Sequence, residues 1–298
     1  MKQIFPNQKN VSRKIIPSPF DKYLGKKNDD ILNDLILPIL DERLKSKKRF
    51  VDMFFGTGRV MLNLQNSHEF IVNDICEPMV DLWKALQEYQ YEFMNAVEKY
   101  FHPSLNNEED FLKMRDEFNQ DKKDIENLAK FAALIYRTRQ GEARFTIKYE
   151  RFNPTFYKRN PIFPRESYEF AIRKLRENHI EFHSTDFSHI LSLLKKGDLV
   201  YGDAPYYPTN GKIRVFKNFK LEDHQRLHRE IKKLSINGAE IWLSNFYNFE
   251  MLFNYELITP KIIDPFSHNA FLFTYPCKGT SEAKKVDTKE MFWRALPA

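Results

Sequence analysis

Residues 50–62 read FVDMFFGTGRVML, and this stretch decides the fold because two glycines break a short apolar run before an apolar pattern resumes. Residues 50–55 have the composition of a buried strand, and the pattern that restarts at Val60 is helical. A second strand is expected at 70–72, and the residues after Asp74 are again helical. Strand, helix and strand in this order predict a parallel βαβ unit.

The same alternation returns after a long interruption by charged, aromatic-rich helical patterns. We therefore predict an α/β, Rossmann-like fold with a largely parallel, twisted sheet, interrupted by an inserted, mainly helical domain. The discontinuous main domain comprises 1–85 and 163–298, and the insertion comprises 86–162. The later strands are expected at 180–183, 198–201 and 240–245, and a helix at 223–234.

The charge balance of the chain is basic. Its 298 residues include 47 Lys+Arg and 41 Asp+Glu, a formal net charge of +6, which favours a polyanionic partner, although scattered surface lysines would give the same balance. Cys76 and Cys277 are far apart and form no CxxC pair, so neither a disulfide framework nor a cysteine zinc site is indicated. No apolar run is long enough to cross a membrane, and we expect a cytoplasmic protein.

The glycine turn predicts a site for an adenosine-containing cofactor. Gly56 and Gly58 let the backbone approach a ligand closely, and Asp74 ends the next strand about 20 residues further on, where acidic side chains bind ribose hydroxyls in Rossmann-like sheets. The dinucleotide motif needs a third glycine where this chain has Met61, whereas S-adenosylmethionine has no pyrophosphate and needs only two. An ordinary strand-to-helix turn, with Asp74 as a helix cap, remains the alternative.

A second motif, Asp203-Ala204-Pro205-Tyr206, follows the strand expected at 198–201. Methyl transfer to an exocyclic amine requires acceptors that hold both amino hydrogens and aim the nitrogen lone pair. The Asp203 carboxylate and the Ala204 carbonyl are suitable acceptors, and the Tyr206 ring can stack on a base that is flipped out of duplex DNA. A surface turn made of turn-forming residues is the alternative.

These motifs, in this order around a central insertion, resemble the Dam-type (alpha-group) DNA N6-adenine methyltransferases. The segments 22–26, 131–144, 243–245 and 284–287 are also similar to segments of that family. The resemblance implies an enzyme that transfers a methyl group from S-adenosylmethionine to adenine in double-stranded DNA, without a metal. It implies that the cofactor-binding residues are Tyr23, Lys26, Asp52, Phe54, Gly56, Gly58, Asp74, Asp186 and Asp203.

The chain departs from the family pattern at two places. Ala204 replaces the first proline of the usual Asp-Pro-Pro-Tyr loop, so its carbonyl can still accept a hydrogen bond but its φ is not fixed by a ring. Segment 131–144 lacks the family's asparagine and is shorter, so recognition of GATC is not implied. Methylation of cytosine N4 or of RNA adenine, and a catalytically weakened relative that only binds DNA, remain open.

Basic and aromatic residues in the insertion and after the catalytic motif predict DNA contacts, although each alone is more often a solvated surface group. His224 and His228 are four residues apart on a predicted helix, but further ligands are missing, so we expect no metal site. A cognate restriction endonuclease is a further possible partner. The expected DNA contacts are Tyr136, Arg137, Arg139, Arg144, Lys148, Lys212 and Arg214.

Overall fold

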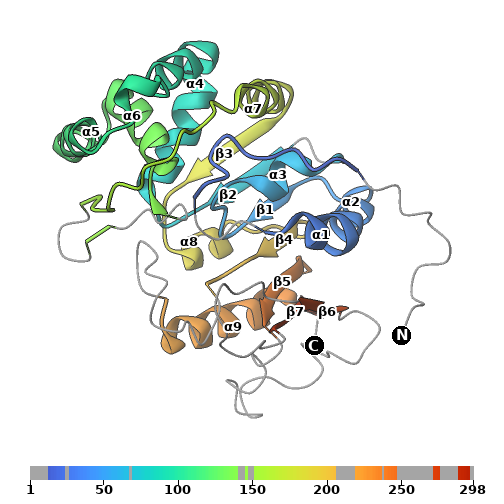
Figure 1. The fold of residues 1–298 in the computed structure, drawn as a ribbon. Coiled ribbons are helices and arrows are strands. Elements are labelled where there is room, and N and C mark those ends of the chain that lie inside the picture. The colour runs from blue at the N-terminus through green and yellow to red at the C-terminus, as the bar shows by residue number, and fades with distance from the viewer. Residues whose placement is uncertain are drawn as a thin grey trace.

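The protein is described from a computed structural model, drawn in Figure 1. Among the helices of the described residues, none is long and apolar enough to cross a membrane. The described residues are 13–23, 27–66, 69–139, 145–146, 151–205, 219–236, 238–246, 271–275 and 288–295.

The described strands form one mixed, seven-stranded sheet in the order β3-β2-β1-β4-β5-β7-β6. The first five strands of this order are parallel, whereas β7 is antiparallel to both β5 and β6. The predicted parallel strands are thus confirmed, and the antiparallel edge was not predicted. The bounds are β1 Phe50–Asp52, β2 Glu69–Asn73, β3 His179–His183, β4 Leu199–Gly202, β5 Glu240–Phe246, β6 Phe271–Tyr275 and β7 Thr288–Ala295.

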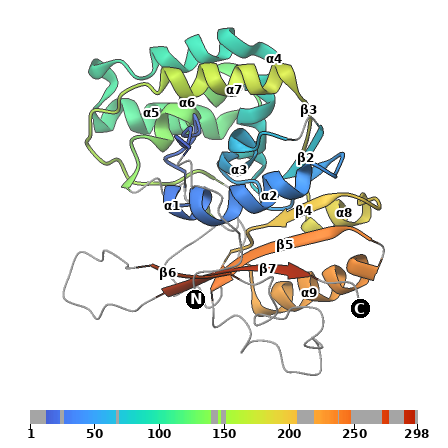
Figure 2. The same cartoon turned by 90° about the vertical axis from the view of Figure 1, so that its right-hand side faces the viewer.

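Helices cover both faces of the sheet, which is why its central strands are buried on both sides and read as continuous apolar runs (Figure 2). Phe50 and Tyr201 face one core, which also contains residues of α2, α3, α4 and α7. Val51 and Val200 face the opposite core, formed with α8 and α9. The helices around the sheet are α1 Asp29–Ile31, the π-helical η1 Leu32–Ile36, α2 Leu37–Leu44, α3 Arg59–Asn63, α8 Phe187–Ser192 and α9 Leu221–Ile236.

The remaining helices gather at the β3 side of the sheet (Figure 1). Helix α4 runs across the predicted boundary at residue 86: its first part buries Trp83, and its backbone breaks at Gln90, where φ is +46°. Its later part packs on α6. Helix α7, which was not predicted, packs on α4 and β3. The bounds are α4 Glu77–Lys99, the 3₁₀ turn η2 Pro103–Leu105, α5 Glu108–Gln120, α6 Ile125–Ile135 and α7 Arg165–Glu177.

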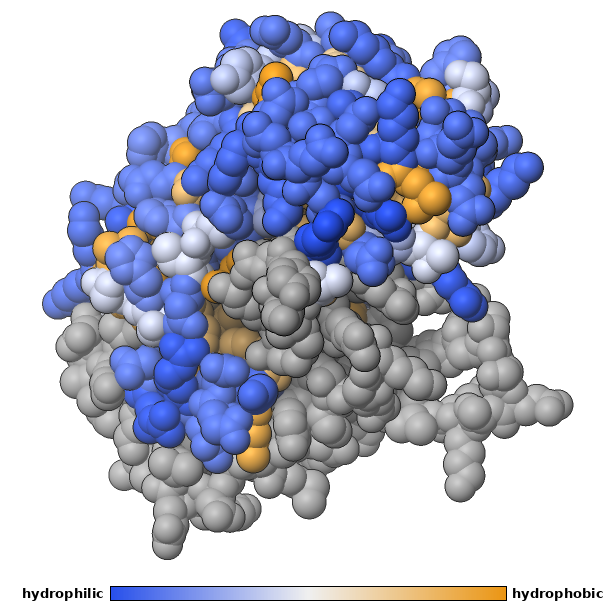
Figure 3. Space-filling model, turned by 90° about the vertical axis from the view of Figure 1, so that its left-hand side faces the viewer, coloured by the Kyte–Doolittle hydropathy of each residue, from blue (hydrophilic) through white to orange (hydrophobic). Residues whose placement is uncertain are grey.

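An aromatic cluster forms the core of this helical region. Phe118 stacks on Phe131 with ring centroids 4.5 Å apart, and Phe152 packs edge-on against both rings. Phe152 also pairs with Phe145 in an antiparallel bridge. Seen from the left of Figure 1, the helical region presents a mostly hydrophilic surface over this core (Figure 3).

Candidate functional site

Three acidic side chains meet at the carboxyl edge of the sheet. Asp52 ends β1, and Asp74 and Asp203 follow β2 and β4, the two strands that flank β1. Asp52 is buried, and burial raises its pKa well above the ordinary value. The charges of Asp203 and Asp74 raise this pKa further, whereas the hydrogen bond from the backbone N–H of Phe54 lowers it. The edge therefore carries crowded negative charge, an environment that favours a cationic ligand.

The half-buried Asp74 organises the glycine turn. Its Oδ2 accepts a hydrogen bond from the backbone N–H of Gly56 at 2.8 Å, and its Oδ1 accepts one from Cys76 at 2.8 Å. Burial raises the pKa of Asp74, and these two N–H groups oppose the shift. Asp74 thus stabilises the turn, but it is not the helix cap that was the alternative, because the N-cap of α4 is Cys76. This role leaves acceptor capacity on both oxygens, because a carboxylate has about four lone-pair sites.

The two glycines of the turn have different reasons to be glycine, although both adopt a positive φ (+51° and +71°). A Cβ at Gly56 would meet nothing within 4 Å, so this side of the turn is open to a ligand. A Cβ at Gly58 would lie 2.6 Å from the rings of Phe55 and Trp83. Trp83 belongs to the core, since its ring is fully buried.

The catalytic motif is joined to the N-terminal segment by an ion pair. Lys27 Nζ lies 2.8 Å from Asp203 Oδ1, and the two side chains are 8% and 15% exposed. The structure thus brings Lys27 to the site, whereas Lys26, the predicted residue, lies outside the described residues. Two adjacent lysines cannot be told apart by sequence pattern alone. Ala204 is buried and Pro205 is half-buried, and Tyr206 lies outside the described residues.

Asp186 lies at the start of α8, where it caps the helix by accepting from the backbone N–H of Ser188. Arg226 of α9 donates to both carboxylate oxygens, at 2.6 and 2.8 Å. Burial alone would raise the pKa of Asp186, but the bonds from Arg226 and Ser188 hold it at about 2. Asp186 is therefore an ionised acceptor at neutral pH. Sequence patterns did not indicate Arg226, which is 40 residues away.

Aromatic rings lie beside this acceptor. The ring centroids of Phe54, Phe187 and Phe219 are 5.7 to 5.9 Å apart, and the Arg226 guanidinium lies 4.3 Å from the Phe187 centroid. Flat apolar rings next to an ionised acceptor suit an aromatic base that carries an amino group. Phe54 was predicted for the cofactor site, and the other two rings were missed.

Tyr23 connects the N-terminal segment to the same edge. The side chain is half-buried, its hydroxyl is hydrogen-bonded with Cys76, and burial, together with Cys76 and Asp74, raises its pKa well above the ordinary value. Tyr23 therefore lies close enough to Asp74 for the Asp74 charge to affect its pKa, and their joint role in a cofactor site stays a prediction.

Two of the predicted DNA contacts are wrong. Arg137 is fully buried, donates to the backbone carbonyls of Ala133 and Tyr100, and has its pKa lowered to about 10 by burial. Tyr136 is 5% exposed and donates from its hydroxyl to the Pro19 carbonyl at 2.8 Å. Both side chains fill the interior where the N-terminal segment and the helical region meet, so neither can reach a phosphate.

Arg139, in contrast, is exposed, as the prediction requires. Further basic side chains lie along the chain that leads to α7: Arg151 and Lys158 are exposed, and Arg159 lies over the exposed ring of Tyr157. This surface suits contacts with phosphates and unstacked bases. The predicted contacts Arg144, Lys148, Lys212 and Arg214 lie outside the described residues.

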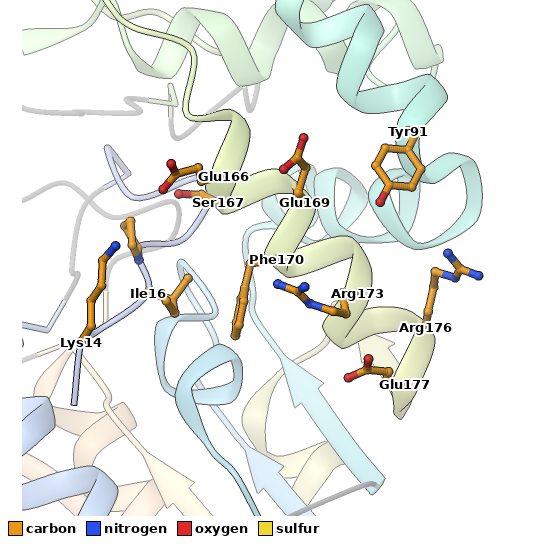
Figure 4. A pocket seen from close by; sticks show the side chains of 11 residues that line it. Lys14, Ile16, Tyr91, Glu166, Ser167, Glu169, Phe170, Arg173, Arg176 and Glu177 are labelled. Carbon is orange, nitrogen blue, oxygen red and sulfur yellow. The ribbon is translucent and has the colours of Figure 1, made fainter. Parts of the chain in front are cut away.

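A hollow of about 870 Å³ lies elsewhere, between the N-terminal segment, α4 and α7 (Figure 4). Lys14 and Ile16 line it from the N-terminal side, and Arg173 and Glu169 from α7. Acidic and basic groups are mixed around it, and none of its lining residues belongs to the carboxyl edge. We do not assign the cofactor to this hollow.

The histidine pair on α9 is buried. Burial lowers the pKa of His224 to about 4 and, together with the charge of His224, that of His228 to about 3. Within the described part of the chain, no group of three His, Cys, Asp or Glu side chains is arranged to hold a metal ion. The two histidines belong to the core beneath α9.

Known proteins resemble this chain over much of its length. A family model described as D12 class N6 adenine-specific DNA methyltransferase matches residues 23–264. Type II methyltransferase M.MjaIII of Methanocaldococcus jannaschii is 29% identical over 257 residues, 78% of this chain and 85% of the relative. DNA adenine methylase of Salmonella typhimurium is 27% identical over 70% of this chain and 76% of the relative. DNA N-6-adenine-methyltransferase of Escherichia phage P1 is 27% identical over 68% of this chain but only 27% of the phage protein.

Proposed function

Because this chain belongs to the D12 class of N6 adenine-specific DNA methyltransferases, we propose that it transfers a methyl group from S-adenosylmethionine to an adenine flipped out of double-stranded DNA. The observation that carries the proposal is the position of Asp203, held by Lys27 at an edge that it shares with Asp52 and Asp74. That edge belongs to a parallel sheet, whose carboxyl ends are the usual place for ligands in this class of fold.

The charge of this edge supports S-adenosylmethionine rather than a phosphate-bearing cofactor. S-Adenosylmethionine carries a sulfonium and an ammonium group, both of which acidic side chains attract, whereas they would repel a pyrophosphate. We assign Asp74 to the ribose hydroxyls, and Asp186 with Phe54 and Phe187 to the adenine ring. The open side of Gly56 leaves room for the ligand.

In the proposed reaction, Asp203 and the Ala204 carbonyl accept hydrogen bonds from the two amino hydrogens of the target adenine. This grip aims the N6 lone pair, and a Tyr206 ring stacked on the base would hold it outside the duplex. S-Adenosylmethionine supplies an electrophilic methyl group. The new N6–carbon bond forms as the carbon–sulfur bond breaks, and one amino proton then leaves to solvent.

We further propose that residues 86–162 form an inserted target-recognition domain. The exposed Arg139 and the basic residues Arg151 and Lys158 support DNA contact there, because exposed cations bind phosphates without sequence selectivity. A restriction endonuclease is proposed as a cellular partner on the ground that one relative is named a type II methyltransferase. DNA from cells that express the chain should then resist cleavage at the methylated sequence.

The reaction is tested by incubating the purified chain with tritiated S-adenosylmethionine and mixed-sequence duplex DNA. After digestion to nucleosides, label is expected in N6-methyldeoxyadenosine. Label in N4-methyldeoxycytidine, or label only when RNA replaces the DNA, would contradict the proposed substrate. Absence of label alongside tight DNA binding would indicate that this chain binds DNA without methylating it. Ala204, in place of the first proline of the usual loop, is the reason to test for this outcome.

A further inference from the structure

The residue after the glycine turn, Arg59, has a buried guanidinium with three partners. It is the first residue of α3, and its side chain is 5% exposed. Nη1 donates to the backbone carbonyl of Lys27 at 2.5 Å, Nε lies 3.3 Å from Asp21 Oδ1, and Nη2 forms an ion pair with Asp29. The hydrogen bond to Lys27 and the ion pairs with Asp29 and Asp21 restrict the orientation of the guanidinium, which is a rigid planar fork, although its Nε makes no hydrogen bond.

The partners of Arg59 lie on both sides of residues 24–26. Asp21 ends a turn in which its N–H donates to the Ser18 carbonyl, and Asp29 opens α1, next to which α3 lies in Figure 2. One side chain thus ties the chain before and after these residues to the helix that follows the glycine turn. The ends of this segment cannot move relative to each other without breaking an Arg59 contact.

The Arg59 contact with Lys27 is made to its main chain, while the Lys27 ammonium reaches Asp203 at 2.8 Å. A free lysine side chain samples many rotamers, and holding it in one costs conformational entropy. Because Arg59 fixes the Lys27 backbone, only the Lys27 side chain has to be ordered for its ammonium to reach Asp203. The order of contacts runs from Arg59 to the Lys27 carbonyl, along the Lys27 side chain, and to the Asp203 carboxylate.

Another polar residue of α3 offers a matched comparison. Asn63 exchanges two hydrogen bonds with the backbone of Ile16, both at 2.9 Å, and so fastens the N-terminal segment at an earlier point. Among the described residues, none of the hydrogen bonds of Asn63 involves Lys27 or Asp203. Asn63 therefore shares the anchoring role of Arg59 but not its connection to the catalytic motif.

We propose that Arg59 is a positioning residue for methyl transfer: by fixing the backbone of Lys27, it holds the Lys27 ammonium against Asp203 and so sets the orientation of that carboxylate. This inference rests on the proposed function of Asp203. It extends that function by connecting the turn assigned to the cofactor with the motif assigned to the target base. Arg59 itself touches neither reactant.

The first test is a double-mutant cycle on single-turnover methyl transfer, with cofactor and DNA at saturation. Arg59→Met is expected to lower the rate about tenfold, as a slightly misplaced catalytic group does, while the Kd for the cofactor changes less than about threefold. In a Lys27→Met background the same change should cost less than about twofold, because its effect passes through Lys27. An equal loss in both backgrounds would overturn the proposal and leave Arg59 a purely structural role.

The second readout does not depend on activity. Acetylation of Lys27 by acetic anhydride, followed by mass spectrometry, should be several-fold faster in Arg59→Met than in the native chain and unchanged in Asn63→Ala. Equal protection of Lys27 in the native chain and in Arg59→Met would refute the positioning. Arg59→Lys keeps the charge without the planar fork and replaces Arg59→Met in both assays if the latter does not fold. If the native chain transfers no methyl group but Lys27 is acetylated faster in Arg59→Met, the proposed function is refuted and the positioning of Lys27 by Arg59 still holds.

Discussion

Charged side chains are removed from water in two regions of this molecule, and their surroundings differ. At the carboxyl edge, Asp74 and Asp203 lie close enough to Asp52 to raise its pKa. In the helical region, Arg137 is fully buried, yet it donates to backbone carbonyls and lies over the Phe101 ring. The first arrangement gathers three acidic groups, of which Asp203 is paired with Lys27, and the second surrounds one guanidinium with backbone carbonyls and an aromatic ring.

This difference separates burial that serves a ligand from burial that serves the fold. Crowded carboxylates cost stability unless something cationic joins them, so an edge of this kind is explained by what it binds. Arg137 is explained by packing, because both of its Nη atoms donate to backbone carbonyls, although its Nε has no hydrogen-bond partner among the described residues. Changes at the edge should therefore alter chemistry and binding, and changes at Arg137 should alter stability.

Asp203→Asn should have the largest effect of all. The change removes one negative acceptor that would grip the adenine amino group, and the single-turnover rate of methyl transfer should fall by about 10²-fold or more, the usual cost of deleting one preorganised polar contact. The free energy of unfolding should also fall, because the nearly buried Lys27 loses its ion pair with Asp203, so the rate is measured on the folded protein. Asp116→Asn, an exposed change on α5, is the matched control and should keep the native rate. A native rate in Asp203→Asn would remove Asp203 from the mechanism.

Arg137→Ala should lower the free energy of unfolding by about 3 kcal/mol, because it leaves a cavity and unpaired buried carbonyls. Urea titration at 15 °C measures this change. At that temperature, the remaining folded protein should bind DNA with the native Kd. If DNA affinity fell with no loss of stability, Arg137 would be a DNA contact after all and the comparison between the two regions would fail.

Asp52 should make cofactor binding depend on pH. Its pKa is raised by burial and by Asp203 and Asp74, so in the free protein it holds a proton to higher pH than an ordinary carboxyl group. A cationic ligand favours the ionised form, and its Kd should therefore fall as pH rises through the Asp52 pKa, by at most about tenfold per pH unit for one proton. Calorimetric titrations from pH 5 to 8 test the sign. Asp52→Asn should flatten the dependence, and an unchanged slope in that variant would exclude Asp52 as its source.

Arg139→Ala should have the smallest effect. As an exposed phosphate contact, Arg139 should contribute about two- to fivefold to DNA affinity, and its loss should reduce the slope of log K against log salt by about one. Fluorescence anisotropy at several salt concentrations measures both, and stability should stay native. Comparing Arg137→Ala with Arg139→Ala thus separates an arginine that stabilises the core from one that contacts DNA. An unaltered salt slope in Arg139→Ala would argue against phosphate contact.

Much of the carboxyl edge could be predicted from sequence because parallel strands bring the residues that follow them to one edge. Asp52, Asp74 and Asp203 each end or follow a strand that its apolar run identifies, so their meeting required only the correct strand order. Lys27 was missed because nothing local distinguishes it from Lys26. Its role depends on an ion pair with a residue 176 positions away.

The helical region was less predictable for a physical reason. Tyr136 and Arg137 follow the last turn of α6, and whether such residues face the core depends on tertiary packing, here on Pro19 and Tyr100. An arginine beside an aromatic residue gives the same local pattern in a DNA interface and in a core. The antiparallel strands β6 and β7 likewise depend on pairing between distant segments, which local periodicity does not reveal.

The most direct test of the account is a crystal structure of the chain with S-adenosylmethionine bound. We predict that the ribose hydroxyls donate to the Asp74 carboxylate, that the adenine ring lies beside Phe54 and Phe187, and that the sulfonium methyl faces Asp203. Binding in the hollow between α4 and α7, or at the carboxyl edge with the ribose away from Asp74, would contradict the proposed site.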